Sequence, residues 1–557
     1  MQRPGYPGWR AGATDYAFRF RRDIRLDTQV LIVGAGPVGL TLAIDLGKRG
    51  IRCILLEQKE APQFLPKMER CNARTMEIYR RLGIAQKIRD AGFPRDVPMD
   101  VFIVTSLVEP PLLHLPYPSV AQAQAEIASH NDGTLPLEPY QLISQYTLEP
   151  LLKSVAESLP AVDVRYGCEF LDFAQDEICV RARVRAKDGA VTELTAPYLV
   201  GCDGGSSGVR RQLGIKLNGE ANLLQLRQAL YRCDDLFERI PIGKGRHYHV
   251  ADDRATFLIV QDSTKHFTLH SVVDSDEDMK TMFEKTVAMP VQYEMLSCAP
   301  WRQNLLVADN YGQGRVFLAG DAVHLVIPTG GLGMNSGVGD AIDLSWKLAA
   351  TLKGWGGPKL LASYEAERRP IGVRNVEASR QASRGRRAWR SMWRPEIRDH
   401  TPAGAEARAN LARVADVEQR KSNEMIGAEL GYCYRGSPIV WPEPGEGPED
   451  NLMKYVPSTW PGARLPHAWC DDGSAMQDRI GDGYTLLRLG RSQADAGPLA
   501  QAFAAYGAPF GVLDVPDERP REIYGCDLLL LRPDLHVVWR GNSLPDAVTL
   551  AALATGH

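Results

Sequence analysis

The sequence lacks several features that define whole classes of protein. None of its ten cysteines lies in a C-x-x-C pair, which argues against a zinc ribbon or a thioredoxin-type dithiol and favours a reducing, cytoplasmic location. No apolar run reaches the roughly 18 residues of a membrane span. Residues 1–27 lack the apolar core of a signal peptide, so we interpret them as an irregular N-terminal extension.

A strong charge imbalance is also missing. The chain has 65 Lys and Arg against 68 Asp and Glu, a net charge of −3, which argues against electrostatic binding to nucleic acid. No cluster of metal ligands and no Ser-His-Asp arrangement stands out, so we expect no metal site. At about 100–200 residues per domain, 557 residues predict about three domains.

A glycine-rich turn near the N-terminus is the strongest motif. Residues 29–33 predict a buried parallel strand, residues 40–46 a helix, and residues 51–57 a second strand. The turn between the first strand and the helix has a G-x-G-x-x-G pattern formed by Gly34, Gly36, Pro37 and Gly39.

Each glycine of this turn has a physical role in binding a dinucleotide. Gly34 permits the tight turn, Gly36 lets the backbone approach a pyrophosphate, and Gly39 lets the helix pack against the strand. The helix N-terminus favours the phosphates, and Glu57, at the end of the second strand, can bind ribose hydroxyls. The combination predicts a bound dinucleotide.

Two glycine-rich segments lie far downstream, at residues 198–211 and 314–335. With residues 66–78 and 143–149 and the first turn, they resemble the single-component flavoprotein aromatic hydroxylases, typified by para-hydroxybenzoate hydroxylase and phenol hydroxylase. The resemblance covers residues 28–380. It implies an α/β fold with a Rossmann-like FAD-binding domain, an inserted antiparallel-sheet substrate domain and a thioredoxin-like C-terminal domain.

The resemblance also extends the cofactor site beyond the first turn. Asp321 can bind a ribityl hydroxyl, and the loop before the helix at residues 333–348 can offer N–H groups to the flavin pyrimidine. Lys67 stands where the family more often has Arg. A lysine cannot make the bidentate contact with the cofactor that an arginine can make. Asp203 is associated with FAD and pyridine nucleotide, although a plain helix N-cap is the alternative. The residues added to the FAD site are Lys67, Gln145, Asp203, Gly320, Asp321, Pro328, Gly331, Leu332, Gly333, Met334 and Asn335.

The predicted domains do not follow one another as consecutive blocks. We assign residues 28–215 and 305–380 to the FAD-binding domain, with an excursion at 100–139. Residues 216–304 are assigned to the substrate sheet, and residues 381–460 to a helical segment and linker. Residues 461–557 form the thioredoxin-like domain, with a structural or oligomeric role. An arginine-rich run at 380–400 is better explained by a solvated helix face or subunit contact than by nucleic-acid binding.

By resemblance, NAD(P)H reduces FAD, O₂ adds at flavin C4a to give a hydroperoxide, and its terminal oxygen is transferred to a phenolic ring, as in aromatic catabolism. NAD(P)H is expected to be a transient co-substrate, because the sequence contains only one classical dinucleotide-binding motif. The predicted partners are a small aromatic substrate, O₂ and a second copy of the chain in a homodimer. Candidates in the sheet for contact with the phenol are His247, Tyr248, His249, Gln261 and His270, and of these we select His270, His249 and Tyr248. Alternation places residues 266, 268 and 270 on one face of a strand.

Two alternatives remain open. Baeyer–Villiger oxidation, epoxidation or dehydrogenation would use the same FAD site. A non-catalytic FAD-binding scaffold protein would also preserve the glycine turn, although it has no need of the loop at residues 331–335.

Overall fold

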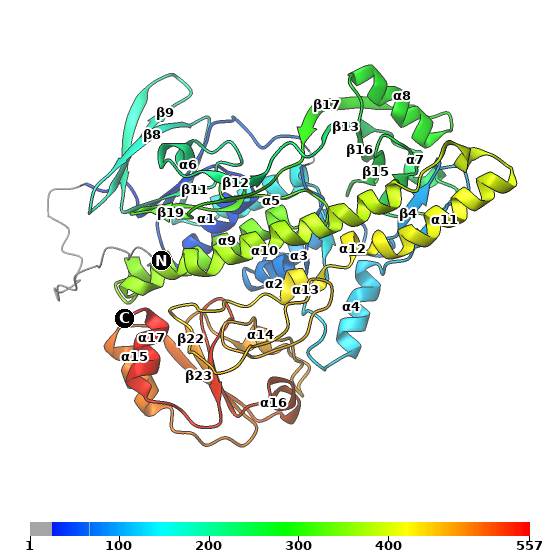
Figure 1. Cartoon of the computed structure of the whole chain (residues 1–557). Coiled ribbons are helices and arrows are strands. Elements are labelled where there is room, and N and C mark those ends of the chain that lie inside the picture. The colour runs from blue at the N-terminus through cyan, green and yellow to red at the C-terminus, as the bar shows by residue number, and fades with distance from the viewer. Residues whose placement is uncertain (1–24, 66) are drawn as a thin grey trace, which may run out of the picture.

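The computed structural model describes residues 25–65 and 67–557, and shows the predicted α/β architecture. The predicted extension therefore lies outside the described residues except for residues 25–27. A long helix, α10 (Pro358–Arg390), crosses the molecule. In Figure 1 the sheet of the predicted FAD-binding domain and the substrate sheet lie on one side of α10, and the C-terminal domain lies on the other.

The first sheet collects strands that are far apart in sequence. Its order is β19-β20-β11-β1-β2-β7, and every neighbouring pair is parallel except β19–β20. The apolar run that predicted the first strand is fully buried, as a central parallel strand requires. The strand bounds are β1 Val30–Val33, β2 Cys53–Glu57, β7 Val162–Tyr166, β11 Tyr198–Gly201, β19 Gly312–Gln313 and β20 Val316–Leu318.

Helix α1 (Pro37–Lys48) lies beside this sheet and packs against two other helices. It contacts α9 (Gly333–Leu352) and α5 (Gln145–Glu157). The approach of α9 depends on Gly337, because a Cβ there would lie 2.5 Å from Val38 Cγ2. This contact brings the N-terminal half of α9 beside the glycine-rich turn.

The substrate sheet has seven strands in the order β17-β13-β16-β15-β14-β4-β5. It differs from the predicted antiparallel sheet in one pair: β4, from the 100–139 excursion, lies parallel to β14. Helix α8 (Asp276–Val287) covers one face, where Phe267 and Leu269 join its core. The strands are β4 Val101–Val104, β5 Leu113–Leu115, β13 Gln225–Arg232, β14 His247–Val250, β15 Phe257–Val260, β16 His266–Ser271 and β17 Glu294–Arg302.

Smaller elements complete the first 430 residues. Three short sheets have the strand orders β10-β9-β8, β12-β18-β21 and β3-β6. Their bounds are β3 Arg70–Cys71, β6 Gln141–Leu142, β8 Glu169–Gln175, β9 Val180–Arg185, β10 Val191–Ala196, β12 Leu217–Glu220, β18 Leu305–Ala308 and β21 His324–Leu325. The helices are α2 Ala73–Arg81, α3 Ala85–Ala91, α4 Val120–Ser129, α6 Gly208–Gln212, α7 Leu236–Arg239, α11 Pro402–Glu418, α12 Arg420–Asn423 and α13 Ile426–Leu430.

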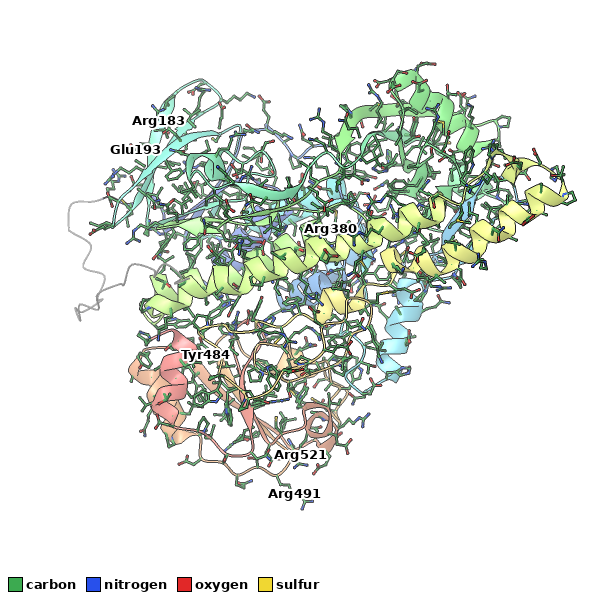
Figure 2. The ribbon with its side chains drawn as sticks, in the orientation of Figure 1. Arg183, Glu193, Arg380, Tyr484, Arg491 and Arg521 are labelled. Carbon is green, nitrogen blue, oxygen red and sulfur yellow. The ribbon has the colours of Figure 1, made fainter. Side chains whose placement is uncertain are left out.

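Helix α10 continues without a break through residue 380 into the arginine-rich run. Arg380, labelled in Figure 2, forms an ion pair with Glu220 at 2.9 Å. Near the end of the helix, Arg390 donates to the carbonyls of Val250 and Thr256 in the substrate sheet. These two arginines therefore join α10 to neighbouring elements of the same chain.

The C-terminal domain has the βαβαββα topology of a thioredoxin-like fold, with sheet order β23-β22-β24-β25. Strand β22 is parallel to β23 and antiparallel to β24. Its Cys470 and Cys526 are buried free thiols. The elements are α14 Met476–Arg479, β22 Tyr484–Leu489, α15 Gly497–Ala505, β23 Phe510–Val515, α16 Glu518–Tyr524, β24 Leu528–Leu531, β25 Val537–Gly541 and α17 Ala547–Thr555.

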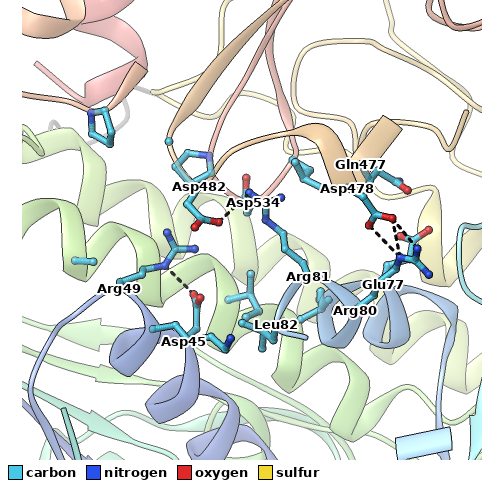
Figure 3. A pocket seen from close by; sticks show the side chains of 18 of the residues that line it. Asp45, Arg49, Glu77, Arg80, Arg81, Leu82, Gln477, Asp478, Asp482 and Asp534 are labelled. Atoms are coloured by element: carbon cyan, nitrogen blue, oxygen red, sulfur yellow. Dashed lines mark hydrogen bonds and ion pairs between the residues drawn. The ribbon is translucent and has the colours of Figure 1, made fainter. Parts of the chain in front are cut away.

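A cavity of about 680 Å³ lies where the C-terminal domain meets α1 and α2. Figure 3 shows Arg80 and Arg81 of α2 facing Asp478 and Asp482 of the C-terminal domain across it. Arg80 and Asp478 form an ion pair at 2.6 Å. None of the predicted cofactor residues lines this cavity.

Within the described residues, no helix combines the length and apolarity needed to cross a membrane. The same part of the chain contains no group of three or more His, Cys, Asp or Glu side chains suited to a metal ion.

Candidate active site

Three strands of the first sheet end at the same edge. The register pairs Val33 with Gly201 and Gly201 with Leu318 in parallel strands. The segments that follow these strands are the turn at Gly34, the Asp203 turn and the Gly320 turn. Three motifs from distant parts of the sequence therefore lie side by side at the carboxyl edge, where open α/β sheets bind ligands.

The glycine-rich turn has the geometry that the sequence predicts. A Cβ on Gly34 (φ +104°) would lie 2.4 Å from the Cys202 carbonyl oxygen, and one on Gly39 would lie 2.0 Å from the Gly34 carbonyl oxygen. At Gly36, by contrast, the nearest atom is Glu149 Oε1 at 4.0 Å. Gly34 and Gly39 are therefore needed for packing, while Gly36 leaves open space at the N-terminus of α1, where Pro37 begins the helix.

Two carboxylates flank this open space. Glu57 accepts hydrogen bonds from the backbone N–H groups of Ala35 and Lys59, both at 3.0 Å. Gln145 donates to Glu149 at 2.5 Å, and burial raises the pKa of the Glu149 carboxyl against the opposing effects of Gln145 and Lys67. Glu149 is a site residue that the sequence motif contained but to which we assigned no role.

Asp203 uses only one of its carboxylate oxygens within the protein. Its Oδ2 accepts from the Val209 N–H at 3.1 Å at the start of α6, which agrees with the helix-capping alternative. Its Oδ1 is buried and has no partner among the described residues. A buried acceptor of this kind is suited to a ligand hydroxyl or N–H group.

Asp321 lies in a short 3-10 turn at Gly320–Ala322. Its side chain is exposed, yet the surrounding protein raises the pKa of its carboxyl by desolvation, with His324 and Lys67 acting in the opposite direction. The carboxylate is thus accessible to a ligand although protein surrounds it. Lys67 is close enough to influence both Asp321 and Glu149.

The loop before α9 is fixed by its neighbours. Gly331 (φ +65°) lies against Arg70, whose Nε would be 2.6 Å from a Cβ at this position. The side chain of Asn335 accepts from the Asn72 N–H at 2.9 Å and donates to the Gly331 carbonyl at 2.6 Å. Asn335 therefore shapes the loop with its side chain and can reach a ligand only through its backbone. The loop also contains exposed Pro328 and ends at Leu332, the N-cap of α9, which is followed by the first helical residues Gly333 and Met334.

Asp340 supports this region from behind and was not predicted from the sequence. It accepts from the Gly320 N–H at 3.1 Å, contacts His324 Nε2 at 2.8 Å and pairs with Arg368 at 2.8 Å. Asp340 lies in α9, in the same helix as the end of the motif, and its spacing of 20 residues from Gly320 carries no recognisable signal. His324 is thus held by Asp340 behind the Gly320 turn.

These features fit FAD. Gly36 opens the N-terminus of α1 to a pyrophosphate, Asp203 has a free buried acceptor, and Asp321 is accessible at the same sheet edge. The α9 N-terminus has no side-chain cap, so its first N–H groups are suited to an electron-rich flavin pyrimidine.

A row of rings crosses the substrate sheet on the face turned toward α10. The register places His249 opposite Phe257 and Phe257 opposite His270. The ring centroids are 5.5 Å apart in the first pair and 4.4 Å apart in the second, and both pairs are stacked. His249 and His270, two of the predicted residues, are therefore brought together around Phe257.

These histidines are neutral near pH 7. Burial lowers the pKa of His270 to about 3 and that of His249 well below its usual value, and Arg386 acts in the same direction on both. Their Nδ1 atoms are buried without a partner in the described structure. Each can therefore serve as a hydrogen-bonding group rather than a cation.

Tyr248 lies on the opposite face of β14. Its hydroxyl donates to the Gly243 carbonyl at 2.8 Å and accepts from the Gly245 N–H at 3.0 Å, and its ring stacks on Phe102. The alternation that brings His249 toward α10 turns Tyr248 into the core. The structure thus separates Tyr248 from the two histidines.

His247 lies next to His249 at the end of the row and is hydrogen-bonded to Glu69. Its Nε2 lies 2.6 Å from Glu69 Oε2. Burial opposes ionisation of Glu69, but His247, Arg246 and Arg70 together lower its pKa to about 2. Burial also lowers the pKa of His247 to about 4, despite Glu69. Glu69 immediately precedes Arg70, which donates to the Gly330 carbonyl, so the Glu69–His247 pair lies near the Gly331 loop. We call Glu69, Arg246, His247, His249, His270 and Arg386 the substrate-sheet cluster.

Comparisons with known proteins agree with this site. The FAD binding domain family matches residues 27–379, and the aromatic-ring hydroxylase C-terminal family matches residues 458–556. The FAD-dependent monooxygenase apdD of Emericella nidulans is 32% identical over 95% of this chain and 90% of its own. Phenol 2-monooxygenase of Pseudomonas sp. (strain EST1001) is 28% identical over 93% of this chain and 90% of its own.

Solved structures extend the similarity to the whole fold. The rebeccamycin biosynthetic enzyme RebC, with bound 7-carboxy-K252c, has a TM-score of 0.87 and 33% identity over 96% of this chain and 100% of its own. Aklavinone-11 hydroxylase, in a complex with FAD and aklavinone, has a TM-score of 0.80 and 27% identity over 95% and 99%. The chain belongs to the FAD-binding aromatic-ring hydroxylase family and is an FAD-dependent monooxygenase.

Proposed function

We propose that this enzyme hydroxylates a phenolic or other electron-rich aromatic compound. The reaction consumes one NAD(P)H, one proton and one O₂; one oxygen atom replaces a ring hydrogen as a hydroxyl, and the other leaves as water. The observation that carries the proposal is the His247–Glu69 pair. Glu69 directly precedes Arg70, which donates to the Gly330 carbonyl in the loop suited to the flavin, and His247 Nδ1 has no partner among the described residues.

Bound FAD would take a hydride from NAD(P)H and, at its C4a position, activate O₂ for transfer of one oxygen atom to the ring. The protein's own part is to hold the ring, exclude water and orient the phenol. The face formed by Phe257 and the two stacked histidines supplies flat, apolar surface for an aromatic ring.

His247 is the group we propose to receive the phenol hydrogen bond. Because Glu69 is ionised and can only accept, His247 donates from Nε2, and its Nδ1 is left as an acceptor. That Nδ1 is buried and has no partner among the described residues. Accepting the phenol hydrogen bond there raises electron density on the ring, which favours attack by an electrophilic oxygen.

The reaction is tested with isotope and cofactor consumption together. Simple phenols, resorcinols and hydroxylated aromatic acids are screened for stimulated oxidation of NADH and NADPH under ¹⁸O₂. We expect a product that has gained one labelled oxygen without ring opening. Unlabelled product would indicate dehydrogenation, a lactone would indicate Baeyer–Villiger oxidation, and no stimulation by any aromatic would contradict the proposal.

The cofactor site is tested at Gly36. We expect Gly36→Val to yield colourless protein, because the branched side chain would fill the space open to the pyrophosphate. Gly50→Val is the matched control, since Gly50 ends the same unit with nothing within 4 Å of its Cβ; although strained at φ +72°, it should remain yellow. Absorption at the flavin band, with circular dichroism for folding, distinguishes the outcomes. Yellow Gly36→Val protein would contradict the assignment.

A further inference from the structure

Arg386 is a cation without a counter-ion. It lies in the last turns of α10, half-buried, with its guanidinium 5.1 Å from the centre of the Phe257 ring. Its Nε is buried and has no partner, and the described residues offer its side chain no hydrogen bond or ion pair. Burial, together with the nearby Arg390 and Arg246, lowers its pKa to about 9, while Glu69 opposes them.

Arg246 is a second arginine of the substrate-sheet cluster with unpartnered atoms. It directly precedes β14 and is 4% exposed. Its Nε and Nη1 are buried without partners, and only its Nη2 can reach an acceptor, the Asn423 side-chain oxygen at 2.9 Å. A buried guanidinium with two unsatisfied N–H groups is costly unless something else binds them.

The neighbouring carboxylates do not resolve this excess of positive charge. Glu429 pairs with Arg70 at 3.2 Å, and Asp252 lies 3.6 Å from Arg390. Among the described residues, the carboxylate that acts on Arg386 is Glu69, and it is hydrogen-bonded to His247. Because the cluster histidines are neutral, two guanidinium groups face one carboxylate, and one negative charge is missing.

We propose that the substrate is an aromatic carboxylate, and that its carboxylate group is held by the guanidinium groups of Arg386 and Arg246 while its ring lies against Phe257 and His270. A carboxylate supplies the missing charge and matches the planar fork of N–H donors. This inference rests on the proposed function and narrows its substrate class.

Binding to the FAD-loaded enzyme tests the charge requirement directly. The probes are 4-hydroxybenzoate and 3-hydroxy-2-naphthoate, each compared with its methyl ester, and the dissociation constants are measured from the change in flavin absorption. At least one acid should bind roughly tenfold to a hundredfold more tightly than its ester, since the ester lacks the charge that strengthens hydrogen bonds to guanidinium.

Variants locate that preference. Arg386→Gln should remove most of the difference between acid and ester, and Arg386→Lys should restore part of it, because Lys keeps the charge but not the fork. Arg387→Gln is the matched control: it removes the same charge from an exposed position one residue away and should leave the preference intact.

Several results would overturn the proposal. These are esters that bind as tightly as their acids, as expected if the arginines bind a phenolate; acids that do not bind; and an Arg386→Gln variant that weakens acid and ester equally. If neutral phenols are still hydroxylated in those cases, the proposed function stands and only the substrate class is wrong. If no aromatic compound is oxygenated, the proposed function itself fails.

Discussion

Two buried groups of charged side chains in this protein differ in how completely their polar atoms are satisfied. One joins α9 and α10 to the C-terminal domain, and we call it the interdomain network: Asp343, Lys347, Glu367, Arg532 and Asp534. In it Arg532 pairs with Asp343 at 2.7 Å, with Glu367 at 2.7 Å and with Asp534 at 2.8 Å. The other is the substrate-sheet cluster, where Arg246 and Arg386 have buried N–H groups without partners.

The difference separates structure from function. Lys347 also pairs with Asp343 and Glu367 within the interdomain network, so each of its cations has at least two carboxylates. Such a network is complete without a ligand and holds two domains in register. In the substrate-sheet cluster, the protein itself does not compensate the free-energy cost of burying the guanidinium groups. Such a cost is expected where a bound molecule accepts hydrogen bonds from their N–H groups.

Breaking the interdomain network should have the largest effect. We expect Arg532→Met to lower the free energy of unfolding by about 3–5 kcal/mol, because it leaves buried carboxylates without their counter-ion. Arg521→Met is the control: the ion pair of Arg521 with Asp527 is exposed to solvent, which screens it, so a much smaller loss is expected. Urea unfolding of both variants measures the difference. Equal losses would mean that the network does not hold the domains.

The pH dependence of stability should report on the substrate-sheet cluster. His270 has a pKa of about 3 in the folded protein and 6.5 in an ordinary environment. Between these values the unfolded chain binds a proton that the folded protein does not, so stability falls as pH falls from 6.5. The loss is up to about 1.4 kcal/mol per pH unit.

This contribution is isolated by comparing variants at pH 6.5 and 4.5. His270→Gln should lose less stability over this interval than the unaltered protein, whereas His130→Gln, at an exposed position, should not differ from it. The groups closest in effect to His270 are Arg386, Glu69 and His247, and both variants retain them. An unchanged slope in His270→Gln would mean that His270 is protonated in the folded enzyme.

The sequence predicted the flavin half of the site better than the substrate half. Gly34, Asp203 and Asp321 follow strands in motifs with local geometry, and parallel strands bring such ends together. His249 and His270 could be selected from strand alternation. Arg386 could not, because its role depends on α10 passing over a sheet more than 100 residues earlier in the chain. Helical periodicity alone favours a solvated face for an arginine-rich run.

The smallest effect should come from removing the unpartnered cation itself. Arg386→Gln breaks no ion pair, and its loss of the contact with Phe257, about 0.5–1 kcal/mol, is offset by relief of an uncompensated buried charge. We therefore expect the free energy of unfolding to change by less than about 1 kcal/mol in either direction, measured by urea unfolding beside Arg532→Met. A loss as large as that of Arg532→Met would show that Arg386 supports the fold, and the contrast between the two charged groups would then disappear.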